Sequence, residues 1–359
     1  ADQAKTEFKA AKEYLDKLLP LLKASNKPNH QKMVTNVETM LNYIKQLFYL
    51  GFWFLRARFF GRRAPLQTVL FITDKCNLRC KHCSVYGSAG YKQRSFEDIV
   101  ADMRYSYKQG SRFIDLEGGE PTLWKEGNRT INDLIDKALE IGFFSITVTT
   151  NAQQDFSWIH PQSIWVSMDG VGEYHDRIRG EGTFARLEEN ISKFLSHHGS
   201  NYNSKIQNSK FPSICVNMVV NALNYESLDA AMEYAKSNPA IEQISINFHT
   251  PYPGTEYLML PPEKKAEIID KVLAYKKKGY PIMNSRSGLK LMKRNALGEI
   301  ELGKECFVTN FIYTDGSRSL CLGYGTEQCR VCGFCMAGEM ASVFHFKPDT
   351  ILSGFKLRM

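Results

Sequence analysis

The sequence predicts an α/β protein built on a partial (β/α)6 barrel, with an N-terminal helical region and a small C-terminal cysteine-rich module. Two observations lead to this prediction. Short β-rich runs alternate with amphipathic stretches through the middle of the chain, and eight of the nine cysteines fall into two tight groups near the ends of that region. Apolar residues make up 43% of the chain and charged residues 23%, which is typical of a globular protein. The net charge of +8 suits anionic partners without choosing among them.

The barrel is expected over residues 65–297. Candidate strands lie at 69–73, 113–116, 145–149, 164–167, 214–220 and 244–248. Candidate helices lie at 95–110, 128–142, 183–198, 226–237 and 261–279. Strands that alternate with helices indicate βαβ units and a parallel sheet, which right-handed crossovers curl into a full or partial barrel. Functional groups are then expected on the loops at the carboxyl ends of the strands.

Residues 1–64 are expected to be helical. An apolar cluster at 15–22 is followed by a polar break at 26–29, and a second helix is predicted to begin near Thr35 or Asn36. Residues 1–17 carry charges throughout and lack the apolar segment of a secretory signal. We therefore expect a cytoplasmic protein, although a processed or engineered start at Ala1 stays open.

The second helix ends in an unusual composition. Its apolar run, 47–55, is shorter than the roughly 20 residues that span a bilayer, and arginines interleaved with Phe59 and Phe60 follow it. Aromatic side chains next to arginines are typical of a helix that lies in an anionic membrane interface. This composition predicts peripheral association with the inner face of the cell membrane. A helix packed across the bottom of the barrel or into an oligomer is the alternative.

The first cysteine group directly follows the first strand. Cys76, Cys80 and Cys83 stand at CxxxCxxC spacing, so their thiolates can bind three corners of an iron–sulfur cubane and leave the fourth iron open. A zinc site with His82 as an added ligand is the alternative. Cys215 stands alone in a predicted strand and is expected to be a small buried hydrophobic residue.

This motif resembles the signature of the radical S-adenosylmethionine (SAM) superfamily, including the aromatic His82 before the last cysteine. The resemblance implies a catalytic [4Fe-4S] cluster and bound SAM, which is cleaved reductively to a 5′-deoxyadenosyl radical. It also implies an electron donor such as flavodoxin or ferredoxin.

Motifs at later strand ends agree with that resemblance. Residues 116–121, Leu-Glu-Gly-Gly-Glu-Pro, resemble the family motif that holds the methionine amine, which gives this role to Gly118, Gly119 and Glu120. Residues 166–180 resemble a stretch found in peptide- and lipid-modifying branches of the family. The resemblance implies that Ser167 bonds polar groups of the cofactor and that Arg179 pairs with its carboxylate.

Three further residues are candidates from their positions. Asn217, on the fifth strand, is a candidate for a ribose contact or an inward polar residue satisfied by backbone groups. His249 and Tyr252 follow the sixth strand and are candidate catalytic residues that bind substrate or relay a proton or electron. A proline-rich turn with incidental ring packing explains them equally well.

The C-terminal module, 298–359, holds the second cysteine group. Its opening, Cys306-x9-Gly316-x4-Cys321, resembles the twitch and SPASM auxiliary-cluster domains, whereas no cysteine follows the later CxxCxxC group. Five thiols can supply one auxiliary [4Fe-4S] cluster with one thiol spare, and structural zinc is the alternative. The candidate ligands are Cys306, Cys321, Cys329, Cys332 and Cys335.

Three hypotheses for function follow. The first is a radical SAM enzyme that modifies an unreactive C–H or C=C position of an apolar, lipid-like or membrane-associated substrate. The second is a radical SAM peptide maturase, and the third is a non-enzymatic iron–sulfur or zinc scaffold. A helical N-terminus, rather than a winged-helix peptide-binding domain, favours the first over the second. A scaffold needs neither the Gly-Gly-Glu-Pro motif nor the Ser167 and Arg179 pair, and no nucleic-acid partner is expected.

Overall fold

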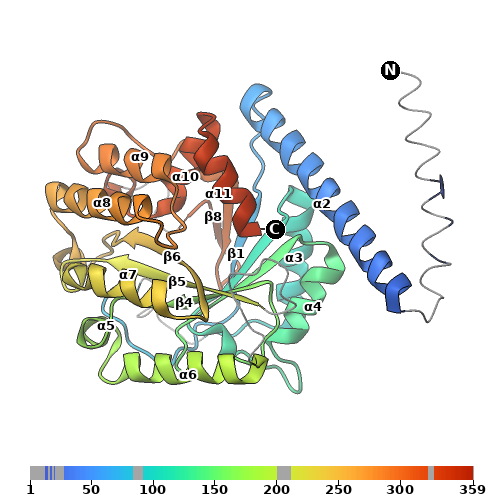
Figure 1. The fold of residues 1–359 in the computed structure, drawn as a ribbon, viewed down its shortest axis with the longest axis horizontal. Coiled ribbons are helices and arrows are strands. Elements are labelled where there is room, and N and C mark those ends of the chain that lie inside the picture. Colours follow the sequence, from blue (N-terminus) through green and yellow to red (C-terminus); the bar gives the residue numbers. More distant parts are fainter. Residues whose placement is uncertain are drawn as a thin grey trace. The chain divides into compact units, whose positions relative to one another are not determined.

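The computed structural model describes residues 13, 14, 17, 20, 28–83, 92–199, 212–321 and 327–358. Contacts divide the chain into two compact units, Ala1–Arg62 and Arg63–Met359. The larger unit has the α/β architecture that the alternating pattern predicted (Figure 1). The apolar cluster expected at 15–22 lies outside the described residues.

The first unit contains one long described helix, α2 (Pro28–Phe59). It begins inside the predicted polar break, earlier than Thr35 or Asn36, because proline is well tolerated in the first turn of a helix. Phe48, Phe52, Leu55 and Phe59 recur at helical spacing and are at least half exposed. No helix in the described part of the chain is both long enough and apolar enough to cross a membrane.

The second unit is organised around one eight-stranded sheet. Its strands are β1 (Gln67–Phe71), β2 (Phe113–Glu117), β3 (Ser145–Thr150), β4 (Ser163–Ser167), β5 (Ser213–Val220), β6 (Ile241–Phe248), β7 (Thr309–Ile312) and β8 (Arg318–Ser319). The spatial order is β6–β5–β4–β3–β2–β1–β7–β8, and every pair is parallel except β7 with β8. The six predicted strands are therefore present, and the sheet has β6 and β8 at its edges.

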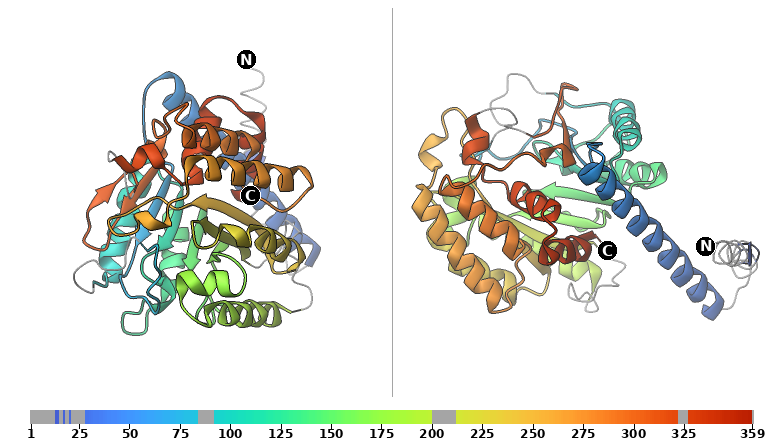
Figure 2. Two further views of the ribbon diagram at one scale, coloured as in Figure 1. Left: turned by 90° about the vertical axis from the view of Figure 1, so that its left-hand side faces the viewer. Right: turned by 90° about the horizontal axis from the view of Figure 1, so that it is seen from above.

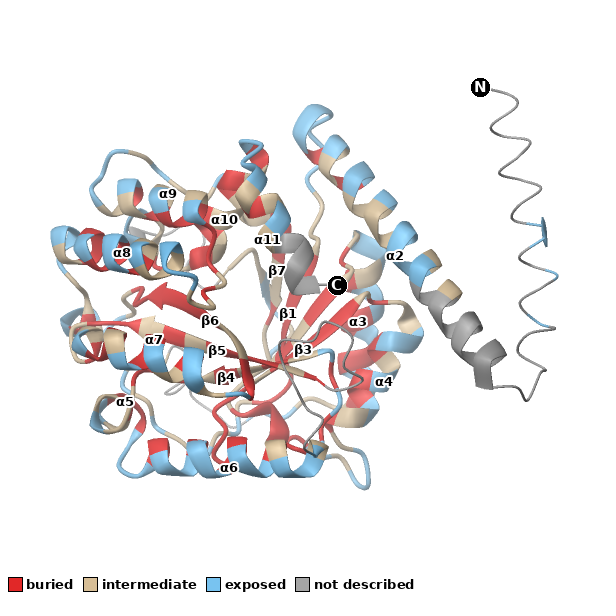
Figure 3. Cartoon of the chain, in the orientation of Figure 1, coloured by how far each residue is buried: buried red, intermediate tan, exposed pale blue. Residues whose placement is uncertain are grey.

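Helices cover the outer face of this curved sheet, as the views in Figures 1 and 2 agree. They are α3 (Phe96–Gln109), α4 (Ile131–Ile141), α6 (Thr183–His198), α7 (Leu228–Ser237) and α8 (Pro262–Lys277). The short helix α5 (Glu173–Arg179) follows β4 instead, and Ile178 O in it accepts a hydrogen bond from Lys81 N–H in the loop after β1. After α8 the chain adds α9 (Arg286–Ala296), α10 (Cys335–Phe344) and α11 (Pro348–Arg358), and α9 packs between α8 and α10. In Figure 3 the buried residues gather on the strands and on the sheet-facing sides of the helices.

The strands alternate between an apolar outer face and a polar inner face. In β2, Ile114 and Leu116 are fully buried in the core that the helices share, whereas Asp115 and Glu117 line an internal cavity. β3, β4 and β5 repeat this alternation with isoleucine, valine or methionine outward and mostly serine, threonine, cysteine or asparagine inward, where Trp165 and Val219 are the apolar exceptions. The helices thus cover a hydrophobic layer, and the inside of the sheet is left free for chemistry.

Candidate active site

The inward-facing side chains and the loops at the carboxyl ends of the strands enclose a cavity of about 410 Å³. Most residues that the sequence singled out line this one space. They are Cys76, Cys80, Cys83, Gly118, Gly119, Glu120, Ser167, Arg179, Asn217, His249, Tyr252 and Cys335. The structure therefore brings together residues of β4 and β5, the loops after β1, β2 and β6, the end of α5 and the start of α10.

The loop that carries the first three cysteines is bound to the loop after β2 by backbone contacts. Gly119 N–H donates to Thr73 O at 2.7 Å, and Glu120 N–H donates to Lys75 O at 2.6 Å. A Cβ atom on Gly119 would lie 2.4 Å from Lys75 O, and one on Gly118 would lie 2.3 Å from Thr73 O. Both glycines are thus needed for the close approach of the cysteine loop.

Glu120 is buried, and its carboxylate accepts four hydrogen bonds within the protein, three at Oε1 and one at Oε2. Oε1 accepts hydrogen bonds from Thr122 N–H at 3.2 Å, Thr122 Oγ1 at 2.6 Å and Thr150 Oγ1 at 2.8 Å, and Oε2 accepts from Asn151 N–H at 2.7 Å. A carboxylate has about four such acceptor positions. Glu120 therefore fixes the end of β3, and its contact with the methionine amine stays a prediction.

Hydrogen-bond donors are aimed at the cysteine sulfurs. Cys76 Sγ accepts from Leu78 N–H at 3.4 Å and from Asn151 Nδ2 at 3.7 Å, and Cys80 Sγ accepts from Arg179 Nη1 at 3.8 Å. Burial raises the pKa of the Cys80 thiol to about 11, and Arg179 opposes that rise. Donors to sulfur favour the deprotonated thiolate, which is the form that binds metal.

Arg179 is held in place by a buried carboxylate. Its Nε donates to Asp169 Oδ2 at 2.7 Å, and Val219 N–H donates to Asp169 Oδ1 at 2.9 Å. Burial pushes the pKa of Asp169 upward, but Arg179 and the neighbouring His82 hold it below its ordinary value. Burial lowers the pKa of His82 itself to about 4, so this imidazole is neutral at pH 7. Arg179 therefore reaches the cluster end of the cavity as a fixed charge.

The three thiols fit an iron–sulfur cubane. All three line the same cavity, and Cys83 lies close enough to Cys76 and to Cys80 to contribute to the raised pKa of each of those two thiols. Within the described ranges, no three His, Cys, Asp or Glu side chains converge on a single ion. A cubane does not require such convergence, because each of its thiolates binds a different iron.

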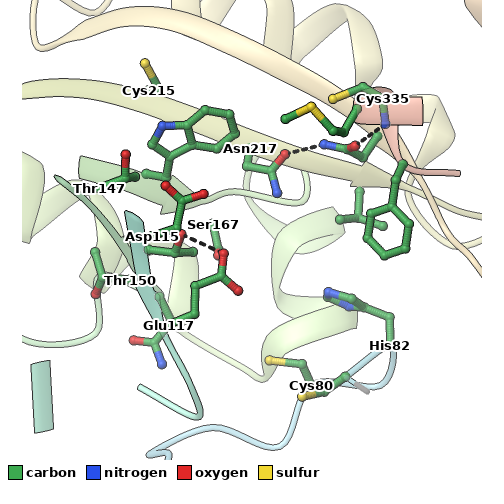
Figure 4. A pocket seen from close by; sticks show the side chains of 18 of the residues that line it. Cys80, His82, Asp115, Glu117, Thr147, Thr150, Ser167, Cys215, Asn217 and Cys335 are labelled. Carbon is green, nitrogen blue, oxygen red and sulfur yellow. Dashed lines mark hydrogen bonds between the residues drawn. The ribbon is translucent and has the colours of Figure 1, made fainter. Parts of the chain in front are cut away.

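The part of the cavity away from the cysteines has a polar wall that the sequence analysis missed. Figure 4 shows Asp115 and Glu117 between Cys80 and Cys215. Burial and the neighbouring Asp115 raise the pKa of Glu117 to about 7, and Thr149 Oγ1 donates to Glu117 Oε1 at 3.3 Å. Glu242 adds a third carboxyl group, whose pKa burial also raises. The inward serines and threonines, in period-two alternation with isoleucine and valine, were the signal that could have revealed this wall.

The structure also shows where the remaining candidate residues of the barrel lie. Cys215 is buried, as expected, but its side chain lines the cavity rather than the apolar core. Asn217 Oδ1 accepts a hydrogen bond from Asn247 Nδ2 at 2.6 Å. His249 and Tyr252 lie together at the rim with ring centres 6.4 Å apart, and His249 Nε2 lies 3.1 Å from Thr255 O. Their catalytic roles stay predictions.

Comparison with known proteins agrees with this geometry. The model of the radical SAM superfamily matches residues 70–207, which span the cysteine loop, the glycine motif and Arg179. Residues 70–207 are therefore similar to the radical SAM superfamily. The match begins within β1 and extends past the end of α6, so it covers less than half of the chain.

Relatives of this protein carry different activities. It is 26% identical over 210 residues to a protein of Methanococcus maripaludis described as "Probable GTP 3',8-cyclase", which covers 56% of this chain and 62% of the relative. It is 28% identical over 141 residues to the subtilosin biosynthesis protein AlbA of Bacillus subtilis, which covers 38% of this chain and 31% of AlbA. The chain thus spans less than two thirds of these relatives.

Solved structures confirm the fold. Streptococcus suis SuiB bound to SAM matches with a TM-score of 0.57 at 15% identity, over 98% of this chain and 78% of SuiB. The protein anSMEcpe, bound to SAM and a peptide, matches with a TM-score of 0.51 at 17% identity, over 82% of this chain and 83% of that protein. At this identity the likeness establishes the radical SAM fold alone.

The five C-terminal cysteines lie in different surroundings. Burial raises the pKa of Cys306 to about 12, and Cys321, Cys332 and Cys329 contribute to that rise, so these sulfurs lie near one another. Cys335 instead begins α10 and lines the central cavity, with its Sγ 3.7 Å from Ser245 Oγ. Cys332 also contributes to the raised pKa of Cys335, so these two thiols lie near each other, and which of the five cysteines bind a cluster stays a prediction.

The segment 333–335 is hydrogen-bonded to the carboxyl end of β6 and to the residues that follow it. Gly333 N–H donates to Thr250 Oγ1 at 2.9 Å, Phe248 N–H donates to Gly333 O at 2.9 Å, and Cys335 N–H donates to Asn247 Oδ1 at 2.8 Å. A Cβ atom on Gly333 would lie 1.8 Å from Phe248 O. These bonds fix the later cysteines beside the cavity that the first three cysteines share.

Proposed function

We propose that this protein is a radical SAM enzyme that modifies a peptide, with its catalytic [4Fe-4S] cluster on Cys76, Cys80 and Cys83. When bound, the cluster and SAM supply a 5′-deoxyadenosyl radical, at the expense of one electron from a donor such as flavodoxin or ferredoxin. Such a radical would accept a hydrogen atom from a substrate C–H bond, which would give 5′-deoxyadenosine and a substrate radical. Ser167 and Arg179 lie where they can bind the polar groups of SAM.

One observation carries the choice of substrate class: the cysteine loop and a carboxyl-lined polar wall face the same cavity. Asp115, Glu117 and Glu242 can accept hydrogen bonds from N–H, O–H or ammonium groups, which amino-acid side chains and backbone supply. Gln67, Thr149 and Ser213 already donate one hydrogen bond to Asp115, Glu117 and Glu242, respectively. A peptide could add donors to the remaining acceptor positions of these carboxyl groups, whereas an acyl chain could not. SuiB, one structural neighbour, has been solved bound to its precursor peptide SuiA, which is in keeping with this choice.

We further propose a second [4Fe-4S] cluster on Cys306, Cys321, Cys329 and Cys332. The mutual influence of these thiols on the pKa of Cys306 supports the grouping. Four cysteine thiolates are the usual complement of such a cluster. Structural zinc is the alternative that iron analysis would reveal.

A lipid-like or membrane-associated substrate remains the second candidate, because α2 exposes an apolar stripe. Phe48, Phe52, Leu55 and Phe59 share one face of the helix with exposed fractions of 50–76%, and the last turn carries Arg56 and Arg58. Such a stripe with adjacent cations suits the surface of an anionic membrane. Peripheral membrane association of this kind is compatible with either substrate class.

Isotope transfer distinguishes the two candidates. The reconstituted enzyme would be incubated with SAM, dithionite and one perdeuterated substrate at a time. One substrate is a peptide encoded beside its gene, and the other is a preparation of anionic lipid vesicles. Deuterium in 5′-deoxyadenosine with a peptide, and none with vesicles, is the expected result. Deuterium transfer from lipid alone would show that the peptide proposal is wrong.

A further inference from the structure

Lys265 breaks the apolar pattern of α8. The buried face of this helix carries Lys265, Ile268, Ile269 and Val272, at the i, i+3, i+4 and i+7 spacing of an amphipathic helix. Lys265 is only 7% exposed, although lysine is almost never buried without a partner. A charged residue at a position suited to an apolar one points to a function that outweighs the cost.

The ammonium group of Lys265 lies against the segment that holds the C-terminal cysteines. Nζ donates to Cys332 O at 2.8 Å and lies 5.3 Å from the centre of the Phe248 ring. Among the described residues, no carboxylate forms an ion pair with it. Its neighbour Lys264 is different, because that side chain is 35% exposed and pairs with Glu267 at 2.9 Å.

A buried cation is costly unless an opposite charge lies nearby. A cubane bound by four thiolates is anionic, because the thiolate charges exceed the positive charge of the core. We propose that Lys265 is the buried countercharge of the centre on Cys306, Cys321, Cys329 and Cys332, and that it raises the reduction potential of that centre. This inference rests on the auxiliary cluster proposed above. A fixed positive charge stabilises the reduced, more negative cluster more than the oxidised one.

The test uses the full chain with Cys76, Cys80 and Cys83 changed to Ala, so that only the C-terminal centre contributes. In this background, Lys265→Met and Lys265→Gln remove the charge, Lys265→Arg keeps it, and Lys264→Met is the matched control. The measurements are iron and zinc content and a redox titration followed by electron paramagnetic resonance. Absence of iron from the background protein would refute the auxiliary cluster itself and would be recognised before any Lys265 variant is compared.

With iron present, the Met and Gln variants should be harder to reduce by at least tenfold in equilibrium constant. This corresponds to a shift of about 59 mV to more negative potential for a one-electron couple. The Arg variant and the Lys264 control should titrate like the background protein. Loss of iron from the Met and Gln variants but not from Arg would also support the countercharge. If Lys265→Gln or Lys265→Met has the same reduction potential and the same iron content as the background protein, the proposal is wrong. Lys265 would then be a structural hydrogen-bond donor.

Discussion

Replacing Glu120 should destabilise the end of β3 and, through it, the first cluster site. Glu120→Ala removes the acceptor for two buried backbone donors, Thr122 N–H and Asn151 N–H. An unsatisfied buried donor costs about 1–3 kcal/mol, so the expected loss of unfolding free energy is about 2–6 kcal/mol. Glu120→Gln keeps Oε1 but turns an amide donor toward Asn151 N–H, which should cost about 1–3 kcal/mol.

The assay is guanidinium unfolding of the metal-free chain, compared with Glu140→Ala as control. Glu140 is 63% exposed and pairs with Lys137 on the surface, where water screens the ion pair, so its replacement should change the unfolding free energy little. Iron binding at the first site should fall with Glu120→Ala as well, because Asn151 Nδ2 contacts Cys76 Sγ. A Glu120→Ala variant as stable as the control would refute the assignment of these four hydrogen bonds to stability.

Three further outcomes follow from the structure. In chains that lack the first three cysteines, Cys332→Ala should lose the auxiliary iron whereas Cys335→Ala should keep it; equal loss in both would show that Cys335 is a ligand. Because the pKa of Glu117 is raised from 4.5 to about 7, the folded protein binds its proton more tightly than the unfolded chain does. The contribution of Glu117 to the unfolding free energy is therefore fully present below pH 4.5 and is lost as the pH rises through 7, a loss of about 3 kcal/mol. Unfolding titrations at several pH values should show this loss in the wild-type protein and not in Glu117→Gln. Sedimentation with anionic vesicles at low salt should weaken when Phe52 and Phe59 become Ser, and wild-type protein that ignores such vesicles would contradict membrane association.

The strands and the first cluster loop were predictable because their signals are local. Each β-rich run is bounded by turn residues or an amphipathic stretch. The three cysteines at 76–83 form one short motif, and the glycines at 118–119 belong to a second. β7 was missed because its four residues form a strand only by pairing with β1, about 240 positions earlier in the chain. The distinction of Cys335 from the other four cysteines likewise depends on Asn247 and Ser245 of β6, which no spacing rule includes.

The polar wall of the cavity was accessible to sequence analysis and was still missed. The recognisable motifs lie at the ends of the strands. Thr147, Ser163 and Ser213 lie within or at the start of strands and resemble ordinary strand residues. Their common inward direction becomes apparent only when the alternation is compared across β3, β4 and β5. The role of Glu120 shows the opposite case: resemblance implied a cofactor contact, and the structure reveals the hydrogen bonds that occupy its carboxylate.

The central claim is that Cys76, Cys80 and Cys83 hold the cluster that cleaves SAM. Its most direct test is formation of 5′-deoxyadenosine by anaerobically reconstituted protein with SAM and dithionite. Wild-type protein should form 5′-deoxyadenosine, and the variant with all three cysteines changed to Ala should form none while it still holds about four irons in the auxiliary cluster. Continued formation of 5′-deoxyadenosine by that variant would contradict the account.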